Sequence, residues 1–211
     1  MITEILFQEY QSRLLRGDRI ACISIVKQLL ADEIRMEELY VQLFQRSLYD
    51  VGLLWETNKI SVAMEHLCTS ITESLINLSY PFLFNTEHSG KKAVVVCTPG
   101  EFHQVGARMV ADYFELNGWD GYFLGVNTPD VELFNFIEKH RPNVLAISMS
   151  VLYNLSTLQH LVDKICNQFP SLKIIIGGQG FRWGGRDSFK TFDNVQIVLT
   201  LDELNEKIFR A

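Results

Sequence analysis

The chain has 211 residues, a formal net charge of −6 and 47% hydrophobic residues, which suffices for one large globular domain or two small ones. The acidic balance argues against nucleic-acid binding, because a phosphate backbone is recognised by a basic surface. No apolar run reaches the roughly 18 residues that a membrane-spanning helix needs, and the N-terminus lacks the pattern of a signal peptide. We therefore expect a cytoplasmic protein that contacts neither nucleic acid nor membrane.

The first part of the chain is predicted to be helical, because its apolar residues recur at spacings of three and four. Four helices joined by short links favour a bundle, and Ser61 is a suitable N-cap for the last of them. The expected helices cover residues 2–16, 18–31, 36–56 and 61–80. In the fourth helix, the expected buried stripe consists of Ala63, Leu67, Ile71, Leu75 and Leu78.

A polar, turn-rich segment, residues 85–91, separates this half from the rest of the chain. We expect the domain boundary there, with a helical cap over residues 1–84 and a second domain over residues 91–211. His88 lies in this segment and is interpreted as a solvated linker residue.

The second domain alternates short apolar runs with helical segments, which is the pattern of a parallel α/β sheet. The expected strands are 93–97, 122–124, 144–147, 174–176 and 195–199, and the expected helices are 104–117, 130–140, 155–168 and 202–210. The predicted fold class is therefore α/β: an N-terminal four-helix bundle cap followed by a flavodoxin-like (Rossmann-like) five-stranded parallel sheet flanked by helices. Such sheets bind ligands beyond the carboxyl ends of their strands.

The first predicted strand is followed by a glutamate and a histidine. Pro99 and Gly100 break the strand, so Glu101 and His103 fall on an exposed loop at the binding edge. Residues two apart in an extended segment point the same way, and a metal-ligating histidine commonly hydrogen-bonds a carboxylate through its other nitrogen. Zinc is disfavoured because no further histidine or cysteine lies at ligand spacing, and Gly106 would let a bulky ligand approach. By itself the pattern also fits a solvated loop histidine.

Two other strand ends carry small residues. The third predicted strand runs into Ser148 and Ser150, and the fourth runs into Gly177 and Gly178. Serines often end strands and glycines often make turns. Paired glycines after an apolar strand also remove side chains where a flat or long ligand could enter.

Together, Glu101-x-His103-x-x-Gly106 and these strand ends resemble the signature of the cobalamin-binding Rossmann-like domain. Methionine synthase, corrinoid methyltransferase carrier proteins and mutases share that domain. The resemblance implies cobalamin bound base-off/His-on: the dimethylbenzimidazole tail is displaced and His103 is the lower axial ligand of cobalt, with Glu101 as its hydrogen-bond partner. It implies that further cofactor-binding residues line the tail channel and the corrin edge. These are Ser148, Ser150, Gly177 and Gly178 for the channel, and Gly125, Val126 and Thr128 for the corrin edge.

The helical cap carries a second group of candidate residues. Trp55 ends the third predicted helix, and Val62, Glu65 and His66 lie on one face of the fourth, near the same end of the bundle. That face is too polar for a core and too mixed for a plain solvated surface. Taken singly, Trp55 also fits a bundle-end core residue and Glu65-His66 an exposed polar pair.

The spacing Trp-x9-Glu-His resembles the cap of light-sensing MerR-type transcriptional regulators that bind adenosylcobalamin. The resemblance implies that Trp55 packs on the upper adenosyl group, that Glu65 and His66 contact it, and that the cofactor is held between the two domains. Glu56 stands where well-known members carry a histidine, and the DNA-binding module of those regulators is absent. A transcriptional effect is therefore expected to pass through a protein partner (a regulator or a kinase) or through self-association.

Three functions compete on this evidence. The leading hypothesis is a non-enzymatic sensor that holds adenosylcobalamin and responds to light or to cobalamin. The alternative is a corrinoid methyl-carrier protein of a methyltransferase system. A receiver-like signalling domain fits poorly, because the first strand ends in Cys97-Thr98-Pro99 and not in acidic residues.

Overall fold

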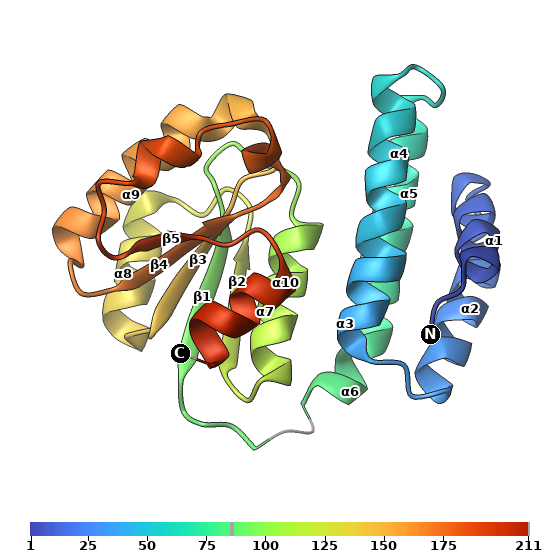
Figure 1. Ribbon diagram of the computed structural model, residues 1–211, viewed down its shortest axis with the longest axis horizontal. Coiled ribbons are helices and arrows are strands. Elements are labelled where there is room, and N and C mark those ends of the chain that lie inside the picture. Colours follow the sequence, from blue (N-terminus) through green and yellow to red (C-terminus); the bar gives the residue numbers. More distant parts are fainter. Residues whose placement is uncertain (85–86, 211) are drawn as a thin grey trace. The chain divides into compact units, whose positions relative to one another are not determined.

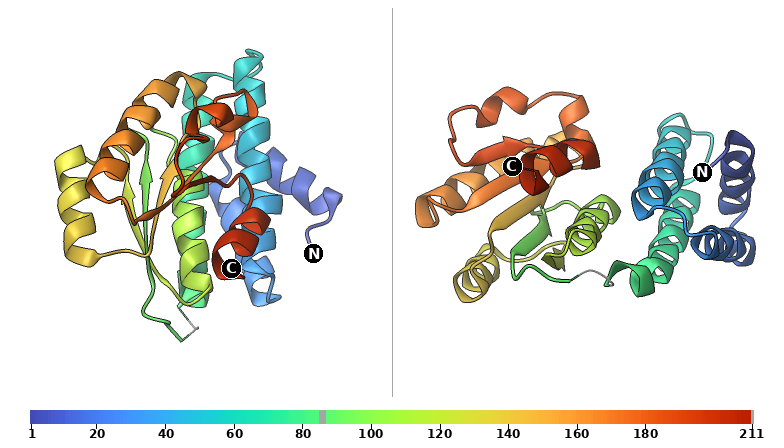
Figure 2. Two further views of the ribbon diagram at one scale, coloured as in Figure 1. Left: turned by 60° about the vertical axis from the view of Figure 1, so that its left-hand side comes forward. Right: turned by 60° about the horizontal axis from the view of Figure 1, so that its bottom comes forward.

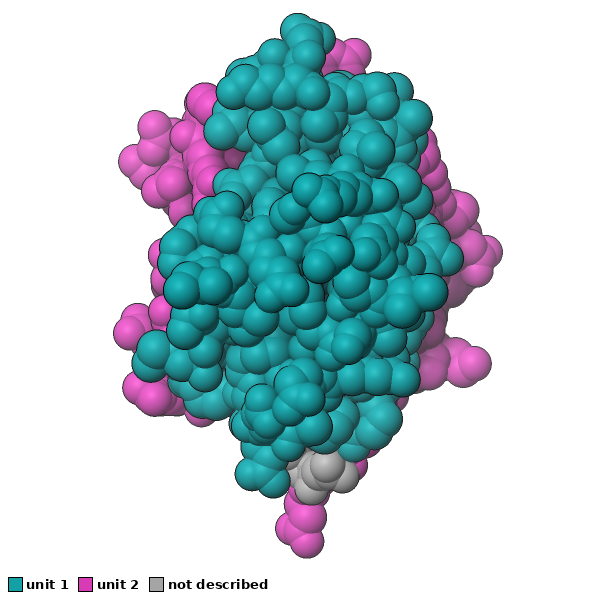
Figure 3. All heavy atoms as spheres, turned by 90° about the vertical axis from the view of Figure 1, so that its right-hand side faces the viewer, with its two compact units in different colours: residues 1–83 teal, residues 84–211 magenta. Residues whose placement is uncertain are grey.

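A computed structural model describes residues 1–84 and 87–210 (Figure 1). The chain divides into two compact units, Met1–Leu83 and Phe84–Ala211, which Figure 3 shows in separate colours. Residues 85 and 86 of the predicted linker lie outside the described residues. Within the described part of the chain, the helices are all too short or too polar to cross a membrane.

Unit 1 consists of four helical rods, where a rod is one α-helix or a continuous run of α-, π- and 3₁₀-helical segments. Its elements are α1 (Glu4–Leu15), α2 (Arg19–Ala31), α3 (Met36–Glu38), a π-helical segment (Leu39–Gln45), α4 (Arg46–Glu56), α5 (Val62–Ile76), a 3₁₀ turn (Asn77–Ser79) and α6 (Tyr80–Leu83). Three rods begin with a side-chain cap: Thr3, Asp18 and Ser61 each accept a hydrogen bond from a backbone N–H three residues later. The predicted cap at Ser61 is therefore confirmed, with Met64 N at 3.2 Å from its hydroxyl.

The predicted buried stripe of α5 is partly wrong. Ile71 and Leu75 are buried as expected, but Ala63 is exposed and Leu67 is 37% exposed, while Cys68 is completely buried. In the first half of α5, the side chain that faces the bundle core is therefore Cys68, one residue after the predicted Leu67. Periodicity gives the width of an apolar stripe but not which of two neighbouring lines faces the other rods.

Unit 2 is a five-stranded, all-parallel sheet in the order β2-β1-β3-β4-β5, which is the flavodoxin-like order and confirms the predicted fold class. Its strands and its α- and π-helices are β1 (Lys92–Cys97), α7 (Val105–Leu116), β2 (Asp120–Gly125), α8 (Asp130–His140), β3 (Val144–Ser148), α9 (Leu155–Gln168), β4 (Lys173–Gly177), β5 (Val195–Ile197), α10 (Leu201–Leu204) and a π-helical segment (Asn205–Phe209). Short 3₁₀ turns lie at Leu152–Asn154, Gln179–Arg182 and Arg186–Phe189. The fifth strand is shorter than predicted, and the expected last helix is a short α-helix followed by π-helix.

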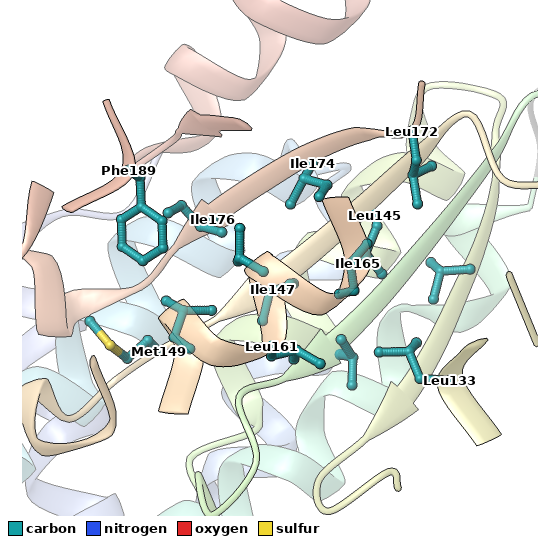
Figure 4. Packing of buried hydrophobic residues seen from close by; sticks show 14 of the residues in the cluster. Leu133, Leu145, Ile147, Met149, Leu161, Ile165, Leu172, Ile174, Ile176 and Phe189 are labelled. Carbon is teal, nitrogen blue, oxygen red and sulfur yellow. The ribbon is translucent and has the colours of Figure 1, made fainter. Parts of the chain in front are cut away.

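Alternate residues of the strands pack on opposite faces of the sheet. Val94 and Val96 belong to the core under α8 and α9, whereas Val95 and Cys97 belong to the core under α7 and α10. Figures 1 and 2 show these helix pairs on the two faces, and Figure 4 shows side chains of the first core, including Leu145 and Ile147. Two covered faces explain why the strands read as continuous apolar runs.

The strand register brings the candidate strand ends to one level. Cys97, the last residue of β1, pairs with Ser148 on β3, and Ser148 pairs with Gly177 on β4. The loops that follow these three strands therefore leave the same carboxyl edge side by side.

His88 is exposed, as expected of a solvated linker residue, but it also has two acidic neighbours that the sequence did not indicate. Its Nδ1 lies 2.7 Å from Asp120 Oδ1, and its Nε2 lies 3.5 Å from Glu115 Oε2. Asp120 begins β2 and Glu115 lies on α7. Both residues are too far from His88 in the sequence to be predicted as its partners from the neighbouring residues alone.

Candidate functional site

The side chains of Glu101 and His103 contact each other on the loop after β1. Glu101 Oε1 accepts hydrogen bonds from His103 Nδ1 at 2.5 Å and from the His103 backbone N–H at 3.1 Å. The Glu101 side chain is 1% exposed, while that of His103 is 54% exposed. The carboxylate is thus an internal support, and the imidazole is presented at the surface of unit 2.

The other oxygen of the same carboxylate reaches the loop after β3. Glu101 Oε2 accepts hydrogen bonds from the backbone N–H groups of Ser150 and Val151, both at 2.9 Å, and from Asn154 Nδ2 at 3.2 Å. A single buried carboxylate therefore fixes two loops that are about fifty residues apart in sequence.

The charge of Glu101 decides which ring nitrogen of His103 donates a hydrogen bond to it. Burial raises the pKa of Glu101, but hydrogen bonds from His103, Val151 and Ser150 outweigh it and lower the pKa to about 2. An ionised carboxylate only accepts hydrogen bonds, so the proton between the two side chains sits on His103 Nδ1. In the neutral ring, Nε2 then carries the lone pair with which imidazole binds a metal.

The donor set restricts which metal species the site fits. Among the residues that the structure describes, there is no cluster of three or more histidine, cysteine, aspartate or glutamate side chains that could hold a metal ion. A structural zinc site, which needs four protein donors, is therefore excluded for this part of the chain. A lone imidazole backed by a carboxylate fits a metal whose other positions are filled by a macrocycle.

Sequence reasoning missed Asn154. The residue directly precedes α9, where an asparagine normally caps the helix, yet its side chain makes no cap hydrogen bond and donates to Glu101 instead. Thr98 was also missed: it is completely buried and donates to the Ser148 carbonyl from both its backbone N–H and its hydroxyl, each at 2.9 Å. Only the fold brings these partners together.

The paired glycines have a structural cause. A Cβ on Gly177 would collide with the Val198 carbonyl oxygen, and a Cβ on Gly178, whose φ is +110°, would collide with the Met149 carbonyl oxygen. The space beside both residues is thus filled by the chain's own backbone. Gly106, in contrast, faces open space at the first turn of α7. That these glycines contact a cofactor stays a prediction.

The remaining candidates of unit 2 lie at the same edge. Ser148 and Ser150 are half-buried. Gly125 ends β2 with a φ of +76° and pairs with Val96 of β1. Half-buried Val126 and Thr128 follow it, and the Thr128 hydroxyl donates to the Leu124 carbonyl at 3.2 Å.

The candidates of unit 1 cluster near the turn between α4 and α5. Trp55 is 45% exposed and Val62 is 50% exposed, so neither is a bundle core residue. Glu65 Oε2 lies 2.5 Å from His66 Nδ1, and Glu65 Oε1 accepts a hydrogen bond from the Thr69 hydroxyl at 3.0 Å. The face therefore combines exposed apolar groups with an ordered polar pair.

A doubly wound parallel sheet with a carboxylate-held histidine at its carboxyl edge is the arrangement of a domain that binds its ligand beyond the ends of its strands. Comparison with known families identifies the kind of ligand. A family model described as B12 binding domain matches residues 91–197, and a second model of the same description matches residues 6–78. The chain belongs to the B12-binding domain family.

Two individual proteins show how far the similarity extends. The HTH-type transcriptional repressor CarA of Myxococcus xanthus is 25% identical over 127 residues, which are 59% of this chain and 43% of that protein. The match therefore spans less than half of that relative. The monomethylamine corrinoid protein of Methanosarcina barkeri is 15% identical, with a TM-score of 0.83 over 100% of both chains. This likeness confirms the fold of a helical cap followed by a parallel α/β sheet.

Proposed function

We propose that the chain binds cobalamin base-off through His103. The observation that carries this proposal is the contact between the buried Glu101 carboxylate and His103 Nδ1, the arrangement in which a histidine binds a metal through its other ring nitrogen. When bound, cobalamin supplies a cobalt–carbon bond that can be broken and formed again. The chain's own residues bind and orient the cofactor, and none is assigned a catalytic step.

The other residues of unit 2 are assigned by their position at the carboxyl edge. Ser150, Val151 and Asn154 hold Glu101, so that the imidazole keeps its orientation when the cofactor binds. We assign Ser148, Ser150, Gly177 and Gly178 to the tail channel, and Gly106, Gly125, Val126 and Thr128 to the corrin edge.

For the use of the cofactor, we propose a corrinoid methyl carrier that works with a methyltransferase partner. The support is the similarity to the monomethylamine corrinoid protein, which extends over both complete chains. The sequence alone favoured the sensor over the methyl carrier, so this proposal reverses that ranking.

The cytoplasmic location stays a prediction.

The second candidate is a sensor of adenosylcobalamin that signals through a protein partner or self-association. Two observations favour it: the similarity to the repressor CarA, and the half-exposed Trp55 and Val62 beside the Glu65–His66 pair. An exposed indole on a helical cap is a suitable surface for a flat adenosyl group.

The two uses are separated by titrating the apoprotein in the dark with adenosylcobalamin and methylcobalamin. If the chain is a methyl carrier, Trp55→Ala should change the affinities for adenosylcobalamin and methylcobalamin by the same factor. In the sensor, Trp55→Ala weakens adenosylcobalamin by roughly tenfold or more relative to methylcobalamin, because about 1.4 kcal/mol or more of stacking is lost. The matched control is Trp183→Ala, an exposed tryptophan of unit 2 in the connection between β4 and β5. If neither cobalamin binds the unaltered chain, the proposed function is wrong.

A further inference from the structure

Thr98 joins the end of the first strand to the end of the third. It directly follows β1 and is completely buried. Its backbone N–H and its hydroxyl both donate to the Ser148 carbonyl, each at 2.9 Å. The Ser148 carbonyl thus accepts two hydrogen bonds from one residue, so Thr98 is fixed to the end of β3 by its side chain as well as by its backbone.

The carbonyl of the same residue holds the turn that leads to Glu101. The Glu101 N–H donates to the Thr98 carbonyl at 2.9 Å, which closes a four-residue turn. Pro99 stands at the second position of this turn, and Gly100, with a φ of +81°, stands at the third, as in a type II turn. Because Glu101 contacts His103, the turn places the imidazole relative to Thr98.

The strand end that Thr98 holds also adjoins the residues assigned to the tail channel. Ser148 pairs with Gly177 of β4, and the Met149 N–H donates to the Gly177 carbonyl at 2.8 Å. The backbone ladder therefore continues from Thr98 through Ser148 to Gly177. Thr98 thus contacts both the turn that supports the metal ligand and the wall of the assigned tail channel.

We propose that Thr98 is a positioning residue that fixes the separation between the His103 imidazole and the tail channel beside Ser148. This inference rests on the proposed function, in which one cobalamin molecule uses both places. The corrin ring and the nucleotide tail of cobalamin are joined covalently. The second contact therefore forms at little further cost only when the protein holds both places at a separation that the linker spans.

The hydroxyl is the part of Thr98 that can be removed without disturbing the backbone. In Thr98→Val the side-chain volume and the N–H that donates to Ser148 are kept. The three donors from the loop after β3 still hold Glu101. Cobalt ligation by His103 should therefore survive, and the loss should fall on the coupling between the two places.

The test compares aquocobalamin with diaquocobinamide, a corrinoid that lacks the nucleotide tail, in spectral titrations of the full-length apoprotein in the dark. The ratio of the two affinities measures what the tail adds to binding. We expect Thr98→Val to lower this ratio by roughly two- to tenfold, the range for one hydrogen bond, with the absorption bands of the cobinamide complex unchanged. Thr98→Ser keeps the hydroxyl and should keep the ratio.

The matched control is Thr191→Val, at an exposed position between β4 and β5, which should change neither affinity. A merely structural role of Thr98 would lower both affinities by the same factor, or only the free energy of unfolding. The proposal is overturned by an unaltered ratio in Thr98→Val, by an equal loss in Thr98→Ser, or by equal affinities for the two corrinoids in the unaltered chain. If the unaltered chain binds neither corrinoid, the proposed function itself is wrong.

Discussion

Two of the carboxylate–histidine pairs among the described residues have the same contact distance and very different surroundings. In Glu101–His103 and in Glu65–His66, a carboxylate oxygen lies 2.5 Å from the histidine Nδ1. The Glu65 side chain is 19% exposed and its histidine is 74% exposed, so this pair stands further out in solvent than the pair of unit 2.

The difference lies in where the supporting donors come from. Glu101 is held by three donors from the distant loop after β3, whereas the further contact of Glu65 is Thr69, one turn along its own helix. A local pair can form in an isolated helix and exchange with solvent. The pair of unit 2 depends on donors from a distant loop, and such support by an outer partner is what orients a metal-ligating imidazole.

The largest effect is expected for His103→Ala. Removal of the His103 imidazole from the carboxyl edge should abolish retention of cobalamin on gel filtration, a greater loss than the roughly 10- to 100-fold typical of an outer partner. His160→Ala, at an exposed position of α9, is the matched control and should retain the cofactor. Equal retention by both variants, with unchanged absorption bands, would contradict the proposed site.

The next largest effect is expected for Glu101→Gln in the apoprotein. Because the pKa of Glu101 is lowered from 4.5 to about 2, its ionised form contributes up to about 3 kcal/mol of stability, fully present above pH 4.5 and lost as the pH falls through about 2. Urea unfolding from pH 7 to pH 2 should show the variant less stable at neutral pH and the difference shrinking in acid. A constant difference across that range would show that the carboxylate charge is unimportant.

A smaller effect is expected for Asn154→Ala, which leaves Glu101 Oε2 with its two backbone donors. Loss of one hydrogen bond to a charged group should cost about 1.5–3 kcal/mol of unfolding free energy and weaken cobalamin binding. Both quantities come from denaturant and spectral titrations. Ser156→Ala, on an exposed position of α9, serves as the control. Unaltered binding in Asn154→Ala would mean that the backbone donors alone orient the pair.

The smallest effect is expected for Glu65→Gln. Its partners are a solvated histidine and a hydroxyl of the same helix, so stability should change by no more than about 0.5 kcal/mol. Chemical denaturation of the apoprotein measures this. A loss of unfolding free energy as large as that of Asn154→Ala would show that the two carboxylates are equally important for stability.

Local patterns were sufficient for some of these features. The turn at Pro99-Gly100 and the two-residue spacing predicted that Glu101 would face His103, and the structure shows that contact. The helix cap at Ser61 could be predicted in the same way, because the acceptor hydroxyl and the donor N–H lie three residues apart. In each case the partners are close in sequence, so the local backbone conformation is enough to bring them together.

Other features required the folded chain. The sequence did not indicate Asn154, whose partner Glu101 lies on the loop after β1. It also did not indicate the two acidic residues that α7 and β2 bring beside the exposed His88. Leu67 and Cys68 are neighbours on one helix, and only the packing of the other rods decides which of them is buried.

The sequence by itself determined the elements, the order of cap and sheet, and the histidine that the B12-binding family implies as the metal ligand. The tertiary structure decided which groups hold that histidine, why Gly177 and Gly178 cannot carry side chains, and where the segment before β1 is attached. The physical reason is that hydrogen bonding and steric exclusion act over a few ångströms, and only strand register and loop packing bring distant residues that close.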